Sequence, residues 1–180
     1  MTENNLDTDE MIYLFRQALC HADAKGRLPI HVALENPHQL TLECIQDFIH
    51  LAPPRIWCTA EHVHGRYPLH VLSASCTPQP GHSALLLSLV RVVYRAYPQA
   101  ARLPDSQGRY PLELALACGA SDEIVLFLLN SCGEGVHGPW AKLFHSAALQ
   151  GASVPVLFAL LQKQPETLDH VFYPTKSSSS

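Results

Sequence analysis

The sequence predicts an all-α protein, an α-solenoid of about four stacked helix-turn-helix repeats behind a helical N-terminal cap. Three observations favour this class. The motif Gly-Arg-x-Pro, followed by isoleucine or leucine, occurs three times. Between the motifs, apolar residues recur at the spacing of one helix face. Strand-like alternation is rare, and no Asn-Gly or Asp-Gly hairpin turn is present.

Composition sets the limits of this prediction. The 180 residues fit one domain, and 47% hydrophobic residues are enough to build a core. Only 16% of the residues are charged and the net charge is −4, so bulk electrostatics give no reason to expect a nucleic-acid partner. The first residues carry no secretory pattern, and the apolar runs are too short to span a bilayer. We therefore expect an intracellular, cytoplasmic protein without a membrane span.

The predicted elements follow in order along a single domain, residues 1–174. A helix at about 7–20 forms the core of the cap, residues 7–22, because solenoids need atypical end units. The repeats are predicted at about 23–61, 62–104, 105–134 and 135–170. The fourth lacks the Gly-Arg motif and is recognised by its similarity to the third. The serine-rich residues 175–180 are expected to be a disordered tail.

Each unit is expected to contain a turn, a short helix and a longer second helix. Prolines suit the first turn of a helix, where the missing N–H has no partner to lose. Pro29, Pro68 and Pro111 therefore mark the starts of the short helices. The longer helices are clearest at 40–51, 83–96 and 121–130, and Pro53, Pro98 and Pro165 stand where second helices should end.

The turns are predicted from a glycine and an acidic residue. Gly26, Gly65 and Gly108 stand three residues before the prolines and should adopt a positive φ, so valine at position 65 should strain its turn. Asp23 and Asp105 are placed to accept turn N–H groups. In the second turn, His62 is expected to occupy the place of the aspartate.

These motifs resemble the ankyrin repeat family, whose signature reads D-x-x-G-x-T-P-L-H-x-A. The matching residues are Asp23, Gly26, Pro29, Ile30, His31 and Ala33 in the first unit, Gly65, Pro68, Leu69 and His70 in the second, and Asp105, Gly108, Pro111, Leu112 and Ala115 in the third. The resemblance covers roughly residues 20–165. It implies binding of a protein partner through turn tips and the concave helical face, without catalysis or a cofactor.

Several positions depart from the family pattern. Leu28, Tyr67 and Tyr110 replace the capping threonine, and Glu113 replaces the histidine of the third unit. The glycines stand 39 and 43 residues apart, whereas ankyrin repeats have a period of about 33. An insertion at 75–82 accounts for part of the excess. These departures concern the turns more than the helix pairs.

The candidate binding residues form a row if the turns stack. Equivalent turn positions are Lys25 and Arg27, His64 and Arg66, and Gln107 and Arg109. One hypothesis is that this row is the polar rim of the partner site. The alternative is that the arginines stabilise the turns, by bonding carbonyl groups or stacking on Tyr67 or Tyr110. The family resemblance favours a protein-interaction module, an adaptor or scaffold.

Two other readings stay open. A structural subunit of a larger assembly would also account for the low charge fraction, because buried interfaces are depleted of charge. A metal or hydrolase accessory site would use Cys58, His62, His64 and His70, although their spacing fits no familiar zinc motif. Trp57 and Trp140 are expected to pack, and all six cysteines are expected to be free thiols.

Overall fold

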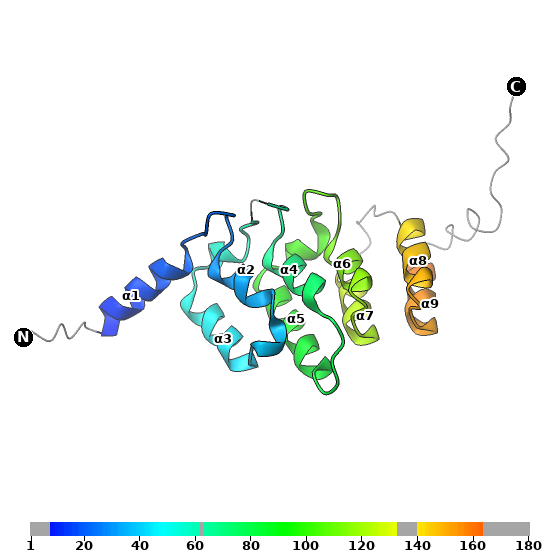
Figure 1. Ribbon diagram of the computed structural model, residues 1–180, viewed down its shortest axis with the longest axis horizontal. Helices are drawn as coiled ribbons and strands as arrows, with labels where there is room; N and C mark the ends of the chain where they lie inside the picture. The colour runs from blue at the N-terminus through cyan, green and yellow to red at the C-terminus, as the bar shows by residue number, and fades with distance from the viewer. Residues whose placement is uncertain (1–7, 62, 133–139, 164–180) are drawn as a thin grey trace, which may run out of the picture.

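The computed structural model describes residues 8–61, 63–132 and 140–163. These residues form helices and loops and contain no strand, so the predicted all-α class is confirmed for the described chain. In chain order the helices are α1 (Thr8–Leu19), α2 (Pro29–Leu34), α3 (Leu42–Leu51), α4 (Pro68–Ser75), α5 (Ser83–Ala96), α6 (Pro111–Ala117), α7 (Asp122–Ser131), α8 (Trp140–Leu149) and α9 (Val154–Lys163). Figure 1 shows their order along the molecule.

The short helices α2, α4 and α6 begin at the three predicted prolines. Each proline follows a residue with extended backbone, which a proline requires of its predecessor. Leu28 and Tyr110 make no side-chain hydrogen bond to the helix N–H groups, and the third helical residue instead accepts the N–H of the N-cap residue. His31 Nδ1 accepts the N–H of Leu28 at 3.1 Å, and Glu113 Oε2 accepts that of Tyr110 at 2.8 Å. Helices α2 and α6 therefore have the half of a capping box in which the third helical residue binds the N-cap N–H.

The second helices match the predicted ranges closely. Helix α5 has the predicted bounds, α3 begins two residues later than predicted, and α7 is shifted by one residue. Helix α3 starts at a capping residue, because Thr41 Oγ1 accepts the N–H of Cys44 at 3.2 Å. Short 3₁₀ helices follow α2, α3 and α5 at Pro37–Gln39, Pro54–Ile56 and Pro98–Arg102.

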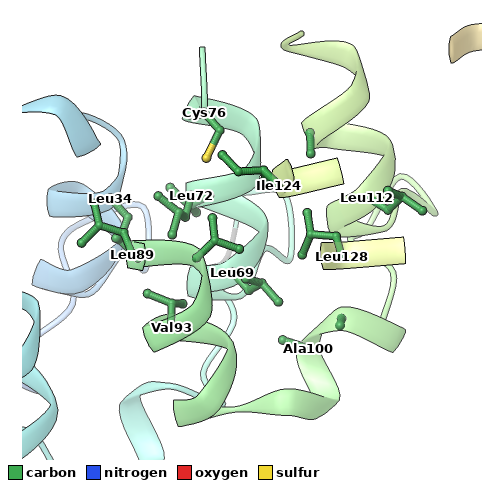
Figure 2. Close-up of a cluster of buried hydrophobic side chains, with 14 of the residues drawn as sticks. Leu34, Leu69, Leu72, Cys76, Leu89, Val93, Ala100, Leu112, Ile124 and Leu128 are labelled. Carbon is green, nitrogen blue, oxygen red and sulfur yellow. The ribbon is translucent and has the colours of Figure 1, made fainter. Parts of the chain in front are cut away.

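The helices pack in two rows, each in chain order. The first-helix row contains α2, α4, α6 and α8, and the second-helix row contains α1, α3, α5, α7 and α9, with contacts between successive members of each row. Apolar side chains from both rows meet in one core. Figure 2 shows this core around Leu69, Leu72, Leu89, Ile124 and Leu128, each at most 1% exposed. Burial of this surface is the main term that stabilises the fold.

The two ends of the described chain leave apolar side chains in solvent. Helix α1 extends from the body (Figure 1), and its residues 11–15 are all 38% or more exposed. At the other end Leu149, Val154 and Phe158 are exposed. Among the described helices, none combines the length and the apolar character needed to cross a bilayer. The predicted tail at 175–180 and most of the linker into the fourth unit lie outside the described residues.

Candidate functional site

Three turns precede α2, α4 and α6 and lie along one edge of the molecule (Figure 1). We name them turn 1 (residues 23–28), turn 2 (61–67) and turn 3 (105–110). Gly26, Gly65 and Gly108 have φ values of 71°, 63° and 76°, as predicted. Only glycine adopts this conformation without strain, and it reverses the chain so that an acidic side chain can reach the turn's own N–H groups.

Turns 1 and 3 share one hydrogen-bond pattern. Asp23 Oδ1 accepts the N–H groups of Lys25 and Arg27, both at 2.9 Å. Asp105 Oδ1 accepts the equivalent groups of Gln107 and Arg109, also at 2.9 Å. Burial tends to raise the pKa of Asp105, but the hydrogen bonds of Arg109 and Gln107 outweigh it and hold this pKa below its usual value of 3.8. Asp105 therefore stays ionised inside its turn.

Turn 2 corrects one prediction. The acid that organises it is Glu61, and not a residue at position 62, which itself lies outside the described residues. The carboxylate of Glu61 accepts the N–H groups of Val63 at 2.7 Å, His64 at 2.8 Å and Arg66 at 3.3 Å. Glu61 stands four residues before its glycine, whereas Asp23 and Asp105 stand three residues before theirs. The longer glutamate side chain spans the extra residue.

The three arginines of the row have different partners. Arg27 binds its own turn through Asp23 Oδ2 at 2.8 Å and the end of α2 through Glu35 Oε1 at 2.8 Å. Arg109 binds Asp105 Oδ2 within turn 3, at 3.0 Å. Arg66 reaches from turn 2 to the same oxygen of Asp105, with Nε at 3.5 Å. The partners are carboxylates, rather than the carbonyl groups or tyrosine rings that the structural alternative named.

Turns 2 and 3 are joined directly. Ser106 donates its N–H to the carbonyl of His64 at 2.8 Å. A Cβ on Gly65 would lie 3.2 Å from the Ser106 nitrogen, so the two backbones approach more closely than most side chains allow. Beneath the turns, His70 Nε2 lies 2.9 Å from the carbonyl oxygen of Leu103. We call this region, where turn 2 and α4 meet turn 3 and α6, the second junction.

The first junction, where turn 1 and α2 meet turn 2 and α4, is open. Within the described residues no hydrogen bond joins turn 1 to turn 2. A groove with a volume of about 210 Å³ lies between them. Its lining includes four predicted binding residues, namely Lys25, Arg27, His64 and Arg66. Gln107 and Arg109 lie on turn 3 and do not line the groove.

Two buried histidines stand under the turns. Burial lowers the pKa of His70 to about 4, so this ring is neutral near neutral pH. Burial also lowers the pKa of His31, although the Glu61 carboxylate and the backbone of Thr59 and Arg66 act in the opposite direction. Both rings are fully buried, and His31 forms part of the groove lining.

The residues considered as metal ligands, Cys58, His64 and His70, lie in different surroundings. Cys58 Sγ donates to the carbonyl of Arg55 at 3.1 Å, and His70 is enclosed at the second junction. His64 lines the groove, while position 62 lies outside the described residues. In the described ranges no three histidine, cysteine or acidic side chains gather as metal ligands.

The cysteines and Trp57, which the sequence singled out, lie outside the groove. All six cysteines are free thiols in the structure, in agreement with the prediction. Trp57 is 3% exposed and packs in the core, as predicted, and the side chain of Trp140 lies outside the described residues. Sequence reasoning missed Glu61 and Glu35 as turn partners. An acidic residue four positions before Gly65 was the available signal for Glu61.

Comparisons with known proteins add no assignment to this geometry. The sequence matches no family model and no curated protein.

Proposed function

We propose that this chain is a divergent ankyrin-like α-solenoid that binds a protein partner along its turn edge and adjoining first-helix face. Two features support the fold assignment. Successive helices contact one another within two rows, the arrangement expected when each repeat touches its neighbours. Three turns repeat the positive-φ glycine, the acid that accepts turn N–H groups, and the proline that starts the next helix.

One observation carries the binding proposal, the groove at the first junction. It brings together Lys25, Arg27, His64 and Arg66, although the first and last of these are 41 positions apart in the chain. Residues of turn 1, turn 2 and α4 line the groove, and we propose that an extended segment of a partner enters it from the turn edge. We propose binding rather than catalysis, because the Glu61 carboxylate is occupied by three backbone N–H groups.

A capture experiment with charge-matched variants tests this function. Wild-type protein, Lys25→Glu and Arg95→Glu are immobilised and incubated with extract from cells that express the protein. Both substituted residues are exposed, but Arg95 lies on α5, away from the groove. Quantitative mass spectrometry should show proteins that wild type and Arg95→Glu retain and Lys25→Glu loses. Equal retention by all three would refute the proposed site.

A second candidate function is a structural subunit of a larger assembly. It is favoured by the apolar side chains at the two ends of the described chain, including Tyr13 at 60% and Val154 at 78% exposure. Exposed apolar patches mark protein contacts in many proteins. This candidate predicts that captured proteins are lost when α1 is made polar, for example by Phe15→Ser, and are kept by Lys25→Glu.

A further inference from the structure

The carboxylates around the groove are already occupied by donors of the protein itself. Glu61 is 4% exposed and accepts backbone N–H groups of its own turn. Glu35 accepts two hydrogen bonds from Nη1 of Arg27, at 2.8 and 3.1 Å. Asp23 of turn 1 binds the Nε and Nη2 side of the same guanidinium group. The carboxylates at the groove therefore already hold donors of the protein itself, while the buried Nε2 of His31 has no hydrogen-bond partner among the described residues.

Cationic donors, in contrast, remain available. Lys25 is exposed, and its ammonium group forms no ion pair within the part of the chain that the structure describes. Arg66 contacts Asp105 through Nε alone, at 3.5 Å, which is long for a hydrogen bond. Its two terminal nitrogens have no hydrogen-bond partner among the described residues, and the side chain as a whole is 21% exposed. These two side chains stand on facing turns, one on each side of the groove.

The rest of the groove lining is small and partly apolar. Val71 and Ala74 come from α4, and Val63 stands on turn 2 with 51% exposure. The volume of about 210 Å³ is below the roughly 300–1,000 Å³ that is usual for small-molecule pockets. A groove of this size fits one side chain of a longer partner rather than a separate ligand.

We propose that the groove binds an acidic peptide segment of the partner that carries a short aliphatic side chain. This inference rests on the protein-binding function proposed above. Carboxylates of the segment pair with Lys25 and Arg66, and its aliphatic side chain lies against Val71 and Ala74. A guanidinium with unused terminal nitrogens matches a carboxylate in charge and geometry. Because the chain as a whole carries −4, an acidic segment finds its complement only at such a local site.

Selection from a random peptide library tests the proposal. Full-length wild-type protein, Lys25→Glu and Arg95→Glu are each presented with phage that display random twelve-residue peptides. Wild type and Arg95→Glu should enrich peptides with an excess of aspartate and glutamate around valine, leucine or alanine. Lys25→Glu should lose this excess. For a selected peptide, fluorescence anisotropy should show affinity weaker by about fivefold in Lys25→Glu and falling with added salt.

The variant is informative because Lys25 contributes only its backbone N–H to turn 1, which a substitution keeps. Circular dichroism and thermal melting of all three proteins provide the folding control. An enriched set without acidic excess, or the same acidic excess in Lys25→Glu, would overturn the proposal. If captured cellular proteins still depend on Lys25 in that case, the binding function stands and only the acidic character is wrong. If no capture depends on Lys25, the binding function itself fails.

Discussion

The two junctions between neighbouring turns have similar sequences but different structures. At the second junction a backbone hydrogen bond, the contact of Arg66 with Asp105 and the bond of His70 to Leu103 join the units. At the first junction the turns are separated by a groove. The difference teaches that a repeated motif does not produce the same hydrogen bonds between units, although α2 packs on α4 as α4 packs on α6.

The turn acids explain this difference. Asp105 uses Oδ1 for its own backbone and leaves Oδ2 free to bind Arg109 at 3.0 Å and to form a longer contact with Arg66 at 3.5 Å. Glu61 of turn 2 is the acid that faces turn 1, as Asp105 of turn 3 faces turn 2. Both of its carboxylate oxygens accept backbone N–H groups of turn 2. Arg27 therefore finds its partners in Asp23 and Glu35, within its own unit. A groove is left where no cross-turn partner exists.

The largest expected effect is a loss of stability at low pH caused by the buried histidine of the second junction. The pKa of His70 is about 4 in the folded protein and 6.5 in an ordinary environment, so between these values the unfolded chain binds more protons. Stability should therefore fall as the pH drops from 6.5 to 4, by about 3 kcal/mol from this ring. Urea unfolding across this pH range should show a flatter profile for His70→Gln than for wild type.

His31→Gln is the matched control at the first junction. Burial lowers the pKa of His31 as well, so its pH effect has the same sign, but the shift is smaller than that of His70. We expect a smaller change of profile than for His70→Gln. Identical profiles for wild type and His70→Gln would show that the pKa of His70 is the same in the folded and unfolded protein.

The next effect concerns the close approach of the turns at the second junction. Gly65→Ala should destabilise the protein by about 2–3 kcal/mol, because alanine is strained at a positive φ and its Cβ meets Ser106. Gly108→Ala should lower stability by about 1–2 kcal/mol, because φ is positive but no atom lies within 4 Å of the added Cβ. Chemical unfolding measures both, and equal losses would contradict the contact.

A smaller loss of stability is expected when the carboxylate of Asp105 is replaced by an amide. Asp105→Asn keeps an oxygen for the backbone but removes the charge that Arg66 and Arg109 share, so stability should fall by about 1–2 kcal/mol at neutral pH. The folded-state pKa of Asp105 is depressed, so its contribution is present above pH 3.8 and is lost as the pH falls through the lowered value. Asp23→Asn is the control at turn 1, where the carboxylate is more exposed. A larger loss for Asp23→Asn would reverse the comparison.

The smallest effect is a difference in thiol reactivity between exposed and buried cysteines. Fast reaction of a buried thiol shows that the structure around it opens. Cys44 and Cys58 are exposed and should react first with a thiol reagent, whereas burial raises the pKa of Cys76 to about 12 and that of Cys132 to about 11. Cys118 donates across the second junction to the carbonyl of Ser73 and should also react slowly. Mass spectrometry of timed samples gives the order. Fast labelling of Cys118 in wild-type protein would show that the second junction opens readily.

The sequence by itself determined the all-α class, the start of α2, α4 and α6 at Pro29, Pro68 and Pro111, and the positive φ of three turn glycines. These features follow from local chemistry, since proline and glycine restrict or free the backbone wherever they stand. Tertiary structure decided that Glu61 organises turn 2 and that Arg27 and Arg66 have different partners. It also decided where the groove lies, because the choice among several nearby carboxylates depends on which oxygens the folded turns leave free.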